Sequence, residues 1–227
     1  MFIIPSTLAS AVRYPLGYRI GALGPRPTQR LELYEFEACP FCRKVREALT
    51  MLDLDAAIRP CPRGGTRFRP DALARGGQQK FPMLVDPDAG AVLYESDAII
   101  AHLYARYGAG QPPLGLRLGP LTNAGSAAAS ALRLGHGRRA RPSRAPETPL
   151  ELWSFELSPY CRRVREELCE LELPYLLHNV GPGSPKRPEL VALGGKMMVP
   201  YLVDPNTHTA MYESRDIVRY LNATYAG

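Results

Sequence analysis

Two cysteines, Cys39 and Cys42, lie within the segment EACPFCRKVREAL (37–49), where they form a C-P-F-C motif. An amphipathic helix is predicted to begin directly after Cys39. Backbone N–H groups and the positive end of the helix dipole stabilise a thiolate at such a position, and Arg43 and Lys44 add positive charge, so we expect a lowered pKa for Cys39. Cys42, one turn further on, can attack a mixed disulfide at Cys39 and release the reduced product. The motif therefore predicts dithiol chemistry.

A second segment, ELSPYCRRVREEL (156–168), repeats this pattern with one informative change. Ser158 stands where the first segment has Cys39, while Cys161 matches Cys42. Because Cys161 lacks its usual partner, we expect it to be a small buried core residue. A competing interpretation of C-P-F-C is half of a zinc site. We favour no metal, because the second segment lacks the matching pair and no histidine lies at ligand spacing.

The repeat extends well beyond these two segments. Residues 31–55 align without gaps with residues 150–174, and residues 80–108 align with residues 198–226. Self-similarity of this kind indicates a duplicated structural unit. We therefore predict two domains of one fold.

The predicted domains occupy residues 31–108 and 150–227. An N-terminal extension, residues 1–30, is not assigned by any pattern. Residues 109–149 form a linker, in which the Ala/Ser-rich stretch 125–134 predicts one helix. A connection of this length is either functional or a spacer.

Within each copy, the spacing of apolar residues predicts a fixed order of elements. In the first copy these are a strand (LELYEF), a helix (CRKVREALTMLDL), a strand (AAIRP), a short helix (RPDALARGG), a hairpin (PMLVDPDAGAVLY) and a closing helix (SDAIIAHLYARYG) with Ser96 as its N-cap. The order β-α-β-α-β-β-α is typical of a thioredoxin-like α/β fold. No long all-helical domain is visible.

Two prolines precede matching extended segments, at Phe81-Pro82 and Val199-Pro200. A proline that begins a strand can be an ordinary edge residue. Opposite the cysteine turn of this fold, however, we predict cis peptide bonds. Such a bond would turn the N–H and C=O of the preceding residue outward, toward a peptide-like ligand.

A Glu-Ser pair follows each proline at the same distance, in YESDAI (94–99) and YESRDI (212–217). Ser96 and Ser214 would be good N-caps in any case. In a functional interpretation, each serine hydroxyl and the free N–H groups of the helix bind a small carboxylate, while Glu95 or Glu213 binds an ammonium group.

The composition narrows the class of protein. Five cysteines in 227 residues are too few for a disulfide scaffold and fit a reducing, cytoplasmic compartment. No apolar run approaches the ~20 residues needed to span a membrane, and MFIIPSTLASAV lacks the basic residues of a signal peptide.

The net charge of +6 is concentrated in LRLGHGRRARPSR (132–144). Because no aromatic residues separate its arginines, we interpret this stretch as a solvated linker, without a nucleic-acid partner.

Both halves resemble the N-terminal, glutaredoxin-like domain of glutathione transferases, and together they resemble bacterial and plastid proteins that carry this domain in tandem. The resemblance covers about two thirds of the chain. It implies glutathione as a cosubstrate. It further implies that the proline loops bind the cysteinyl backbone of glutathione and that the Glu-Ser pairs bind its γ-glutamyl end. The residues concerned are Phe81, Pro82, Glu95, Ser96, Val199, Pro200, Glu213 and Ser214.

These observations favour a glutathione-dependent thiol–disulfide oxidoreductase, with Cys39 as nucleophile and Cys42 as resolving thiol. A second hypothesis is glutathione conjugation or peroxide reduction, with bound glutathione activated by Ser158 or Cys39. Its partner would be a small electrophile rather than a disulfide, and the missing helical domain makes bulky substrates doubtful. A third hypothesis is a redox-inactive glutathione-binding or scaffold protein, in which the twin domains and the basic linker bind a partner. Independently of this choice, the half with Ser158 and Cys161 can be non-catalytic, with a structural or partner-binding role.

Overall fold

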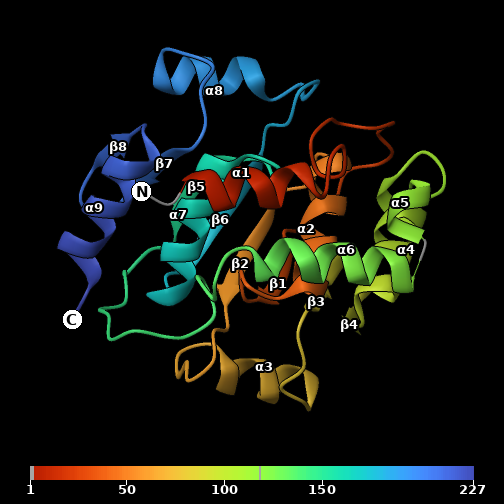
Figure 1. Cartoon of the computed structure of the whole chain (residues 1–227), viewed down its shortest axis with the longest axis horizontal. Helices are drawn as coiled ribbons and strands as arrows, with labels where there is room; N and C mark the ends of the chain where they lie inside the picture. Colours follow the sequence, from red (N-terminus) through yellow and green to blue (C-terminus); the bar gives the residue numbers. More distant parts are fainter. Residues whose placement is uncertain (1–2, 118) are drawn as a thin grey trace.

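The computed structural model describes residues 3–117 and 119–227, and its strands form one mixed sheet. The strand order in this sheet is β4-β3-β1-β2-β6-β5-β7-β8. The first half of the sheet comes from residues 31–108 and the second from residues 150–227, which we call the first half and the second half. Figure 1 shows both halves of the sheet at the centre of the molecule, with α3 and α8 at opposite ends of the view.

Both halves contain the same elements in the same order. The first half has β1 (Leu31–Glu35), α2 (Pro40–Met51), β2 (Ala56–Pro60), α3 (Arg69–Gly76), β3 (Met83–Asp86), the 3-10 turn η1 (Pro87–Ala89), β4 (Ala91–Tyr94) and α4 (Ser96–Tyr107). The second half has β5 (Leu150–Ser154), α7 (Pro159–Glu170), β6 (Tyr175–Asn179), α8 (Arg187–Gly194), β7 (Tyr201–Asp204), β8 (Thr209–Met211) and α9 (Ser214–Tyr225). Apart from η1, each element of the first half has its counterpart in the second.

The two halves join through the strands β2 and β6. Within each half the first strand pairs in parallel with the second and antiparallel with the third. Strands β2 and β6 then pair antiparallel, with Ala56 opposite Leu177 and Ile58 opposite Tyr175. One hydrophobic cluster contains buried residues of both halves. Neither the shared sheet nor the shared core was predicted from the sequence.

Helix α2 illustrates why the elements form where the periodicity predicts them. Pro40 occupies the first turn, where its missing N–H costs no hydrogen bond. Val45 and Leu49 lie on the buried face, and Leu52 follows at the C-cap. All three belong to the core cluster under the sheet, so burial of this apolar stripe orients the helix and with it the residues at its start.

Two helices outside the repeat pattern pack across the halves. Helix α1 (Ile3–Ala11), in the extension left unassigned by sequence, packs on α7 of the second half. Helix α6 (Pro120–Ala131), which begins earlier than the predicted 125, packs on α2 of the first half. A third short helix, α5 (Leu114–Arg117), precedes it. Figure 1 shows α1 and α6 side by side in front of the sheet, and the two helices are in contact.

Matching residues fix these two helices. The Ser6 hydroxyl donates to the Pro159 carbonyl at 3.0 Å, and the Ser126 hydroxyl donates to the Pro40 carbonyl at 2.6 Å. After each helix comes a buried arginine that binds a buried glutamate at 2.5 Å; these pairs are Arg13–Glu47 and Arg133–Glu166. The duplicated pattern therefore includes α1 and α6, which the sequence alignment missed.

The basic linker is less solvated than the sequence indicated. Arg133 is buried against Glu166, and Arg141 pairs with Glu167 and Glu170 on α7. The interpretation of residues 132–144 as a fully solvated stretch was therefore wrong in part, because these arginines attach the linker to the second half.

A cluster of charged side chains is buried where the halves meet; it consists of Glu35, Glu37, Arg46, Glu156 and Arg165, and we call it the junction cluster. Arg46 binds Glu35, Glu37 at 3.2 Å and Glu156 at 2.9 Å. Arg165, its counterpart in the second half, binds Glu37 at 3.1 Å and Glu156 at 2.7 Å. Each of the five side chains is at most 3% exposed. Both arginines therefore link one half to the other.

We predict that Glu156→Gln destabilises the protein strongly. Burial alone would raise the pKa of Glu156, but Arg165, Arg46 and Arg43 outweigh it and hold the pKa at about 2. Removing one partner of a buried ion pair leaves the other charge uncompensated, which costs about 3–5 kcal/mol. Urea unfolding measures this loss. As a control, Asp216→Asn removes the partner of the exposed Arg219 and should change the unfolding free energy by less than about 0.5 kcal/mol. Equal losses in both variants would contradict the prediction.

Candidate functional site

Cys39 lies at the N-cap of α2, where the sequence predicts a stabilised thiolate. Its sulfur accepts a hydrogen bond from the Cys42 backbone N–H at 3.3 Å. The side-chain hydrogen bond from the Cys42 thiol lowers the pKa of Cys39, burial opposes this, and the backbone N–H groups of Cys42 and Phe41 lower it further. The net shift of the Cys39 pKa is downward.

Arg43 and Lys44 are not among the main causes of the lowered Cys39 pKa. Arg43 lies 3.6 Å from Glu47 and 3.7 Å from Glu156. Lys44 binds Asp97 on α4 and also Asn123 on α6. Both cations therefore form ion pairs with structural partners, because they lie on the face of α2 that other elements cover.

Cys42 is the buried member of the pair. Burial raises the pKa of this thiol well above its ordinary value, and the hydrogen bond to Cys39 and the nearby negative charges of Cys39 and Glu35 add to the rise. The Phe36 backbone N–H acts in the opposite direction. The motif therefore pairs an outer sulfur whose pKa is lowered with an inner thiol whose pKa is raised.

Ser158 reproduces the position of Cys39 in the second half. It forms the N-cap of α7, and its hydroxyl oxygen accepts a hydrogen bond from the Cys161 backbone N–H at 3.3 Å. Cys161 is fully buried. Burial raises the pKa of Cys161 despite an opposing hydrogen bond with Ser158. The site is thus preserved in shape, with a hydroxyl in place of the outer thiol.

Both proline bonds are cis, at Phe81-Pro82 and Val199-Pro200, as the sequence predicts. Pro82 and Pro200 are buried, whereas Phe81 and Val199 are half-buried. The Arg69 guanidinium lies over the Phe81 ring at 5.0 Å from its centre. In each half, the residue before the proline therefore remains partly accessible to a ligand.

The Glu-Ser pairs depart from the sequence prediction in one respect. Glu95, not Ser96, is the N-cap of α4, with φ of 64° and no side-chain capping bond. Glu213 has the same role before Ser214, with φ of 70°. The serines are the first helical residues and are buried, because the left-handed glutamate turns the chain one residue earlier than expected.

The two glutamates differ in their partners. The Glu95 carboxylate forms an exposed ion pair with Lys80. In the described part of the chain, the Glu213 side chain has no hydrogen-bond or ion-pair partner. The predicted ammonium site of the second half is therefore open, while that of the first half holds a lysine.

A cavity of about 810 Å³ brings Ser158 and Val199 together in the second half. Most of its other side chains are aromatic or small, namely Thr7, Ser10, Ala11, Tyr14, Tyr18, Phe155, Leu157, Pro159 and Tyr160. Five of these residues come from α1 and the segment that follows it. Sequence reasoning missed them, although Tyr14 and Tyr18 in an otherwise unassigned extension were a usable signal.

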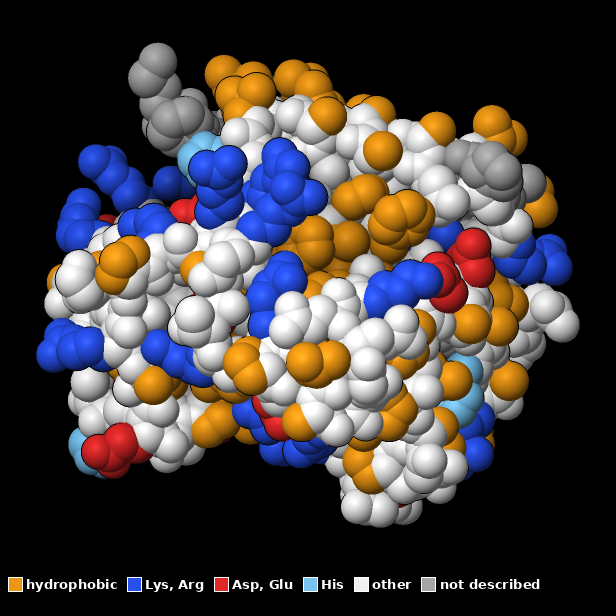
Figure 2. All heavy atoms as spheres, turned by 90° about the horizontal axis from the view of Figure 1, so that it is seen from below, with side chains coloured by type: hydrophobic (Ala, Val, Ile, Leu, Met, Phe, Trp, Pro, Cys, Tyr) orange, Lys and Arg blue, Asp and Glu red, His pale blue; other side chains and the backbone are white. Residues whose placement is uncertain are grey.

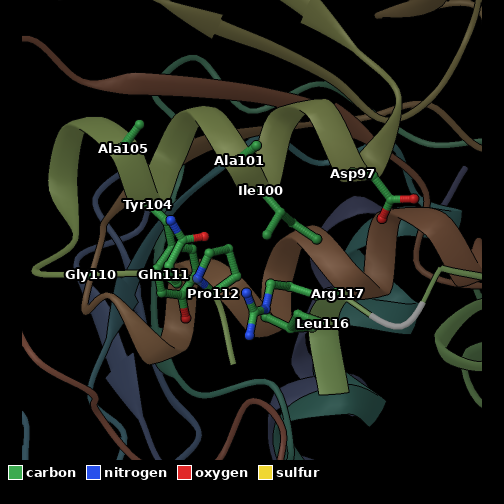
Figure 3. Close-up of a pocket in the computed structure, with 10 residues that line it drawn as sticks. All are labelled: Asp97, Ile100, Ala101, Tyr104, Ala105, Gly110, Gln111, Pro112, Leu116 and Arg117. Carbon is green, nitrogen blue, oxygen red and sulfur yellow. The ribbon is translucent and has the colours of Figure 1, made fainter. Parts of the chain in front are cut away.

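A smaller hollow of about 460 Å³ lies along α4 in the first half (Figure 3). Asp97, Ile100 and Tyr104 contribute from the helix, and residues 110–117 close the other side. Asp97 directly follows Ser96, but no cysteine lines the hollow. It is therefore separate from the Cys39 site.

The charged side chains of one face are distributed without an obvious focus. Figure 2 shows Lys and Arg side chains spread over one face, with hydrophobic side chains exposed between them. Within residues 3–117 and 119–227, no group of three or more His, Cys, Asp or Glu side chains could hold a metal ion. None of the helices in that part is long and apolar enough to cross a membrane.

A mixed α/β fold with a cysteine or serine at a helix start and a cis-proline just before the third strand of each half is typical of a thioredoxin-like class of protein. The family model of the glutathione S-transferase N-terminal domain matches residues 33–113 and 152–227. The chain therefore belongs to the glutathione S-transferase N-terminal domain family, and the resemblance found in the sequence is confirmed.

Two fungal relatives and two solved structures share part of the chain. The glutathione S-transferase-like protein tpcF of Aspergillus fumigatus is 38% identical over 63 residues, 28% of each chain. Its counterpart gedE of Aspergillus terreus is 35% identical over 77 residues, 34% of each chain. The match thus spans about a third or less of these curated relatives.

Among solved structures, the Bombyx mori glutathione transferase BmGSTD1 is 28% identical, with 44% of this chain and 45% of that chain covered and a TM-score of 0.34. The trimeric Leishmania glutathione transferase TDR1 is 16% identical, with coverage of 88% and 68% and a TM-score of 0.31.

We predict that iodoacetamide at neutral pH modifies Cys39 before any other cysteine. Burial raises the pKa of Cys42, Cys61, Cys161 and Cys169, whereas the pKa of Cys39 is lowered. Because the thiolate is the reactive form, the alkylation rates should follow this order. Peptide mass mapping over time measures it, and alkylation that begins at another cysteine would contradict it.

Proposed function

We propose that the protein is a glutathione-dependent thiol–disulfide oxidoreductase that works through Cys39. The observation that carries the proposal is the pair of sulfurs at the start of α2, where the Cys42 thiol hydrogen-bonds a Cys39 sulfur whose pKa is lowered. Glutathione is inferred from the family to which both halves belong. We further propose that each half, residues 31–108 and 150–227, is a thioredoxin-like domain.

The first chemical step takes place at Cys39. Its thiolate attacks the glutathione sulfur of a mixed disulfide between glutathione and a substrate thiol. The bond between the two substrate sulfurs breaks, a Cys39–glutathione disulfide forms, and the substrate leaves as a thiolate. The positive end of α2 stabilises the attacking sulfur.

The second step releases glutathione. Cys42 attacks the Cys39 sulfur, so that a Cys39–Cys42 disulfide forms, the bond from Cys39 to glutathione breaks, and glutathione departs as a thiol that carries the proton lost by Cys42. Two glutathione molecules then reduce this disulfide and are themselves oxidised. Because the two cysteines lie one turn apart at the N-terminus of one helix, the attack needs no rearrangement of secondary structure.

Glutathione would be held by the residues that the family resemblance implies. The backbone beside Phe81 and Pro82 pairs with its cysteinyl part, while Ser96 and the N-terminal N–H groups of α4 bind its γ-glutamyl carboxylate. Its ammonium group replaces Lys80 at Glu95. An exposed ion pair of this kind contributes at most about 1 kcal/mol, so its exchange costs little.

A second activity is supported by the cavity of the second half. We infer that the Ser158 hydroxyl donates a hydrogen bond to a glutathione thiolate, and that a small apolar electrophile occupies the cavity beside Tyr14, Tyr18 and Phe155. The backbone beside Val199 and Pro200, together with Glu213 and Ser214, would hold glutathione there. This half would then conjugate rather than exchange disulfides.

We predict that Cys39→Ser abolishes disulfide reduction, because the serine hydroxyl is not ionised at neutral pH. The measurement is reduction of a glutathione-mixed disulfide, coupled to consumption of NADPH through glutathione reductase. Cys161→Ser, which changes a buried thiol in the other half, should retain the wild-type rate. Undiminished activity of Cys39→Ser would overturn the assignment.

For the second half, Ser158→Ala should lower the rate of conjugation of 1-chloro-2,4-dinitrobenzene by about 100-fold, the effect of removing one donor to a developing anion. Cys39→Ser serves as the control and should leave this rate unchanged. If neither variant alters the rate, conjugation does not occur at Ser158. Failure of both halves to bind glutathione in calorimetry would favour a scaffold role instead.

A further inference from the structure

Helices α1 and α6 turn their polar side chains inward and their large apolar side chains toward solvent. Ser6 and Ser126 lie on the inner faces, where their hydroxyls donate to carbonyl groups of α7 and α2. The outer faces expose Ile4 and Leu8 of α1 and Leu121 of α6. A surface helix of a globular protein has the opposite pattern, with its polar side chains in water. The outward apolar side chains of these two helices therefore need an explanation.

The exposed side chains of the two helices form a continuous surface, which we call the front face. They recur every three or four residues, so they lie along one side of each helix. The two helices pack against each other, so these sides join. Neither helix carries a charged residue. The side chains of the front face are those of Ile4, Leu8, Val12, Leu121, Ala124, Ala128 and Ala131.

The fold attaches these helices through their other side. The buried residues Ala9 and Ala129 allow close packing there, and the serine hydroxyls and the buried arginine–glutamate pairs fix the position of each helix. The front face lies opposite these attachments. A contiguous exposed apolar surface of this kind marks a site of interaction.

The two segments that carry these helices are strongly basic. Residues 1–30 and 109–149 contain ten arginines and a single acidic residue, Glu147. The whole chain has a net charge of +6, so its positive charge comes from these segments and the two halves are slightly acidic. Several arginines of the chain that flanks the helices are exposed and, within residues 3–117 and 119–227, form no ion pair or side-chain hydrogen bond. They are Arg19, Arg117, Arg138 and Arg139.

Figure 2 shows how the two kinds of side chain lie relative to each other. It is viewed from below Figure 1, so the front of Figure 1, with α1 and α6, forms its upper edge. Hydrophobic side chains line this edge, and Lys and Arg side chains lie directly beneath it. The apolar surface therefore has basic groups beside it.

An anionic phospholipid bilayer fits these properties better than a second copy of the chain does. The front face offers only hydrocarbon side chains, and the backbone groups beneath it bond within their own helix, as a lipid environment requires. Arginines beside such a face suit anionic headgroups. A second copy would instead bring the same positive charge against the first.

We propose that α1 and α6 form a docking surface for an anionic phospholipid bilayer. The apolar side chains of the front face enter the boundary between headgroups and acyl chains, and the flanking arginines pair with the headgroups. This inference does not depend on the chemistry at Cys39. It does place that site, because Ser126 on the inner side of α6 binds the carbonyl of Pro40, the residue after Cys39. A docked protein therefore holds Cys39 close to the bilayer, behind α6.

Co-sedimentation with vesicles tests the docking surface. The 227-residue chain is mixed with sucrose-loaded vesicles of phosphatidylcholine alone or of equal parts phosphatidylcholine and phosphatidylglycerol, and the bound fraction is measured at low and high salt. We expect binding to the vesicles that contain phosphatidylglycerol, weak binding to phosphatidylcholine alone, and weaker binding at high salt, which screens the arginines from the headgroups. A chain that does not bind the anionic vesicles at low salt overturns the proposal, whatever the variants do.

Two single variants, Leu8→Ser and Leu121→Ser, test the apolar contribution. Each changes an exposed side chain that the fold does not use, so the helix content measured by circular dichroism should stay unchanged while the vesicle partition coefficient falls about 10-fold. Leu193→Ser on α8 is the matched control, because Leu193 and Leu8 are similarly exposed, at 56% and 51%. This control should bind as the wild type does. Equal losses in all three variants, or no loss in any of them, would overturn the role of the front face.

A double variant tests the arginines. Arg138→Gln with Arg139→Gln removes two basic groups beside the front face and should weaken binding to the anionic vesicles about 20-fold. Arg75→Gln with Lys196→Gln removes two positive charges at the ends of α3 and α8 and should have a much smaller effect, because the attraction falls off within a Debye length of the bilayer. Equal losses in both double variants would indicate binding by net charge alone and would contradict the docking surface.

Sedimentation equilibrium without vesicles separates the bilayer from a second copy of the chain. We expect a monomer, with the same mass for the wild type and Leu8→Ser. A wild-type dimer that Leu8→Ser converts to a monomer would mean that a second copy covers the front face, and it would overturn the proposal. None of these outcomes affects the proposed oxidoreductase function, because the changed residues lie outside the candidate sites.

Discussion

The ion pairs of the junction cluster constrain the rest of the structure. Two guanidinium groups and their carboxylates are removed from water, and burial of such charges is tolerable only while each keeps its partners. Arg46 and Arg165 find those partners in both halves. The halves must therefore stay in register, and antiparallel pairing of β2 with β6 is the backbone arrangement that accompanies this register.

The same arginines lie on the helices that position the candidate sites. Arg46 is on α2, which begins after Cys39, and Arg165 is on α7, which begins after Ser158. Any movement between the halves would therefore change the charge around both helix starts. Thr50 and Cys169 reinforce this coupling, because each accepts a hydrogen bond from the backbone N–H of the glutamate in the opposite half. The two candidate sites thus share a frame that both halves build.

Local sequence patterns predicted the elements of each half well, and for a physical reason. Residues such as Val45 and Leu49 are buried within their own half, so their spacing follows the period of the helix that carries them. The cis bonds before Pro82 and Pro200 were predicted from the place of these prolines in the fold that the local patterns indicated, and both are present. Membership of the glutathione S-transferase N-terminal domain family followed from the same local motifs.

What the sequence did not predict depends on contacts between distant residues. The positive charges of Arg43 and Lys44 were expected to act on Cys39. Instead, Arg43 lies near Glu156 and Lys44 forms an ion pair with Asp97, and both carboxylates belong to other elements. Arg133 looked solvated because the pattern of the linker alone cannot show that Glu166 lies opposite. The position of Ser96 was misjudged by one residue because the left-handed conformation of Glu95 is not encoded by a glycine or asparagine.

The crossed packing of α1 and α6 changes the meaning of the long connection. Helix α6 comes before the second half but covers the first, and α1 comes before the first half but covers the second. Two units that exchange their N-terminal helices have this arrangement, here held within one chain. The linker therefore supplies a covering helix to the first half and is more than a connection. In the same crossed arrangement, the segment after α1 brings Tyr14 and Tyr18 to the cavity beside Ser158, so part of the wall of that cavity comes from outside the second half.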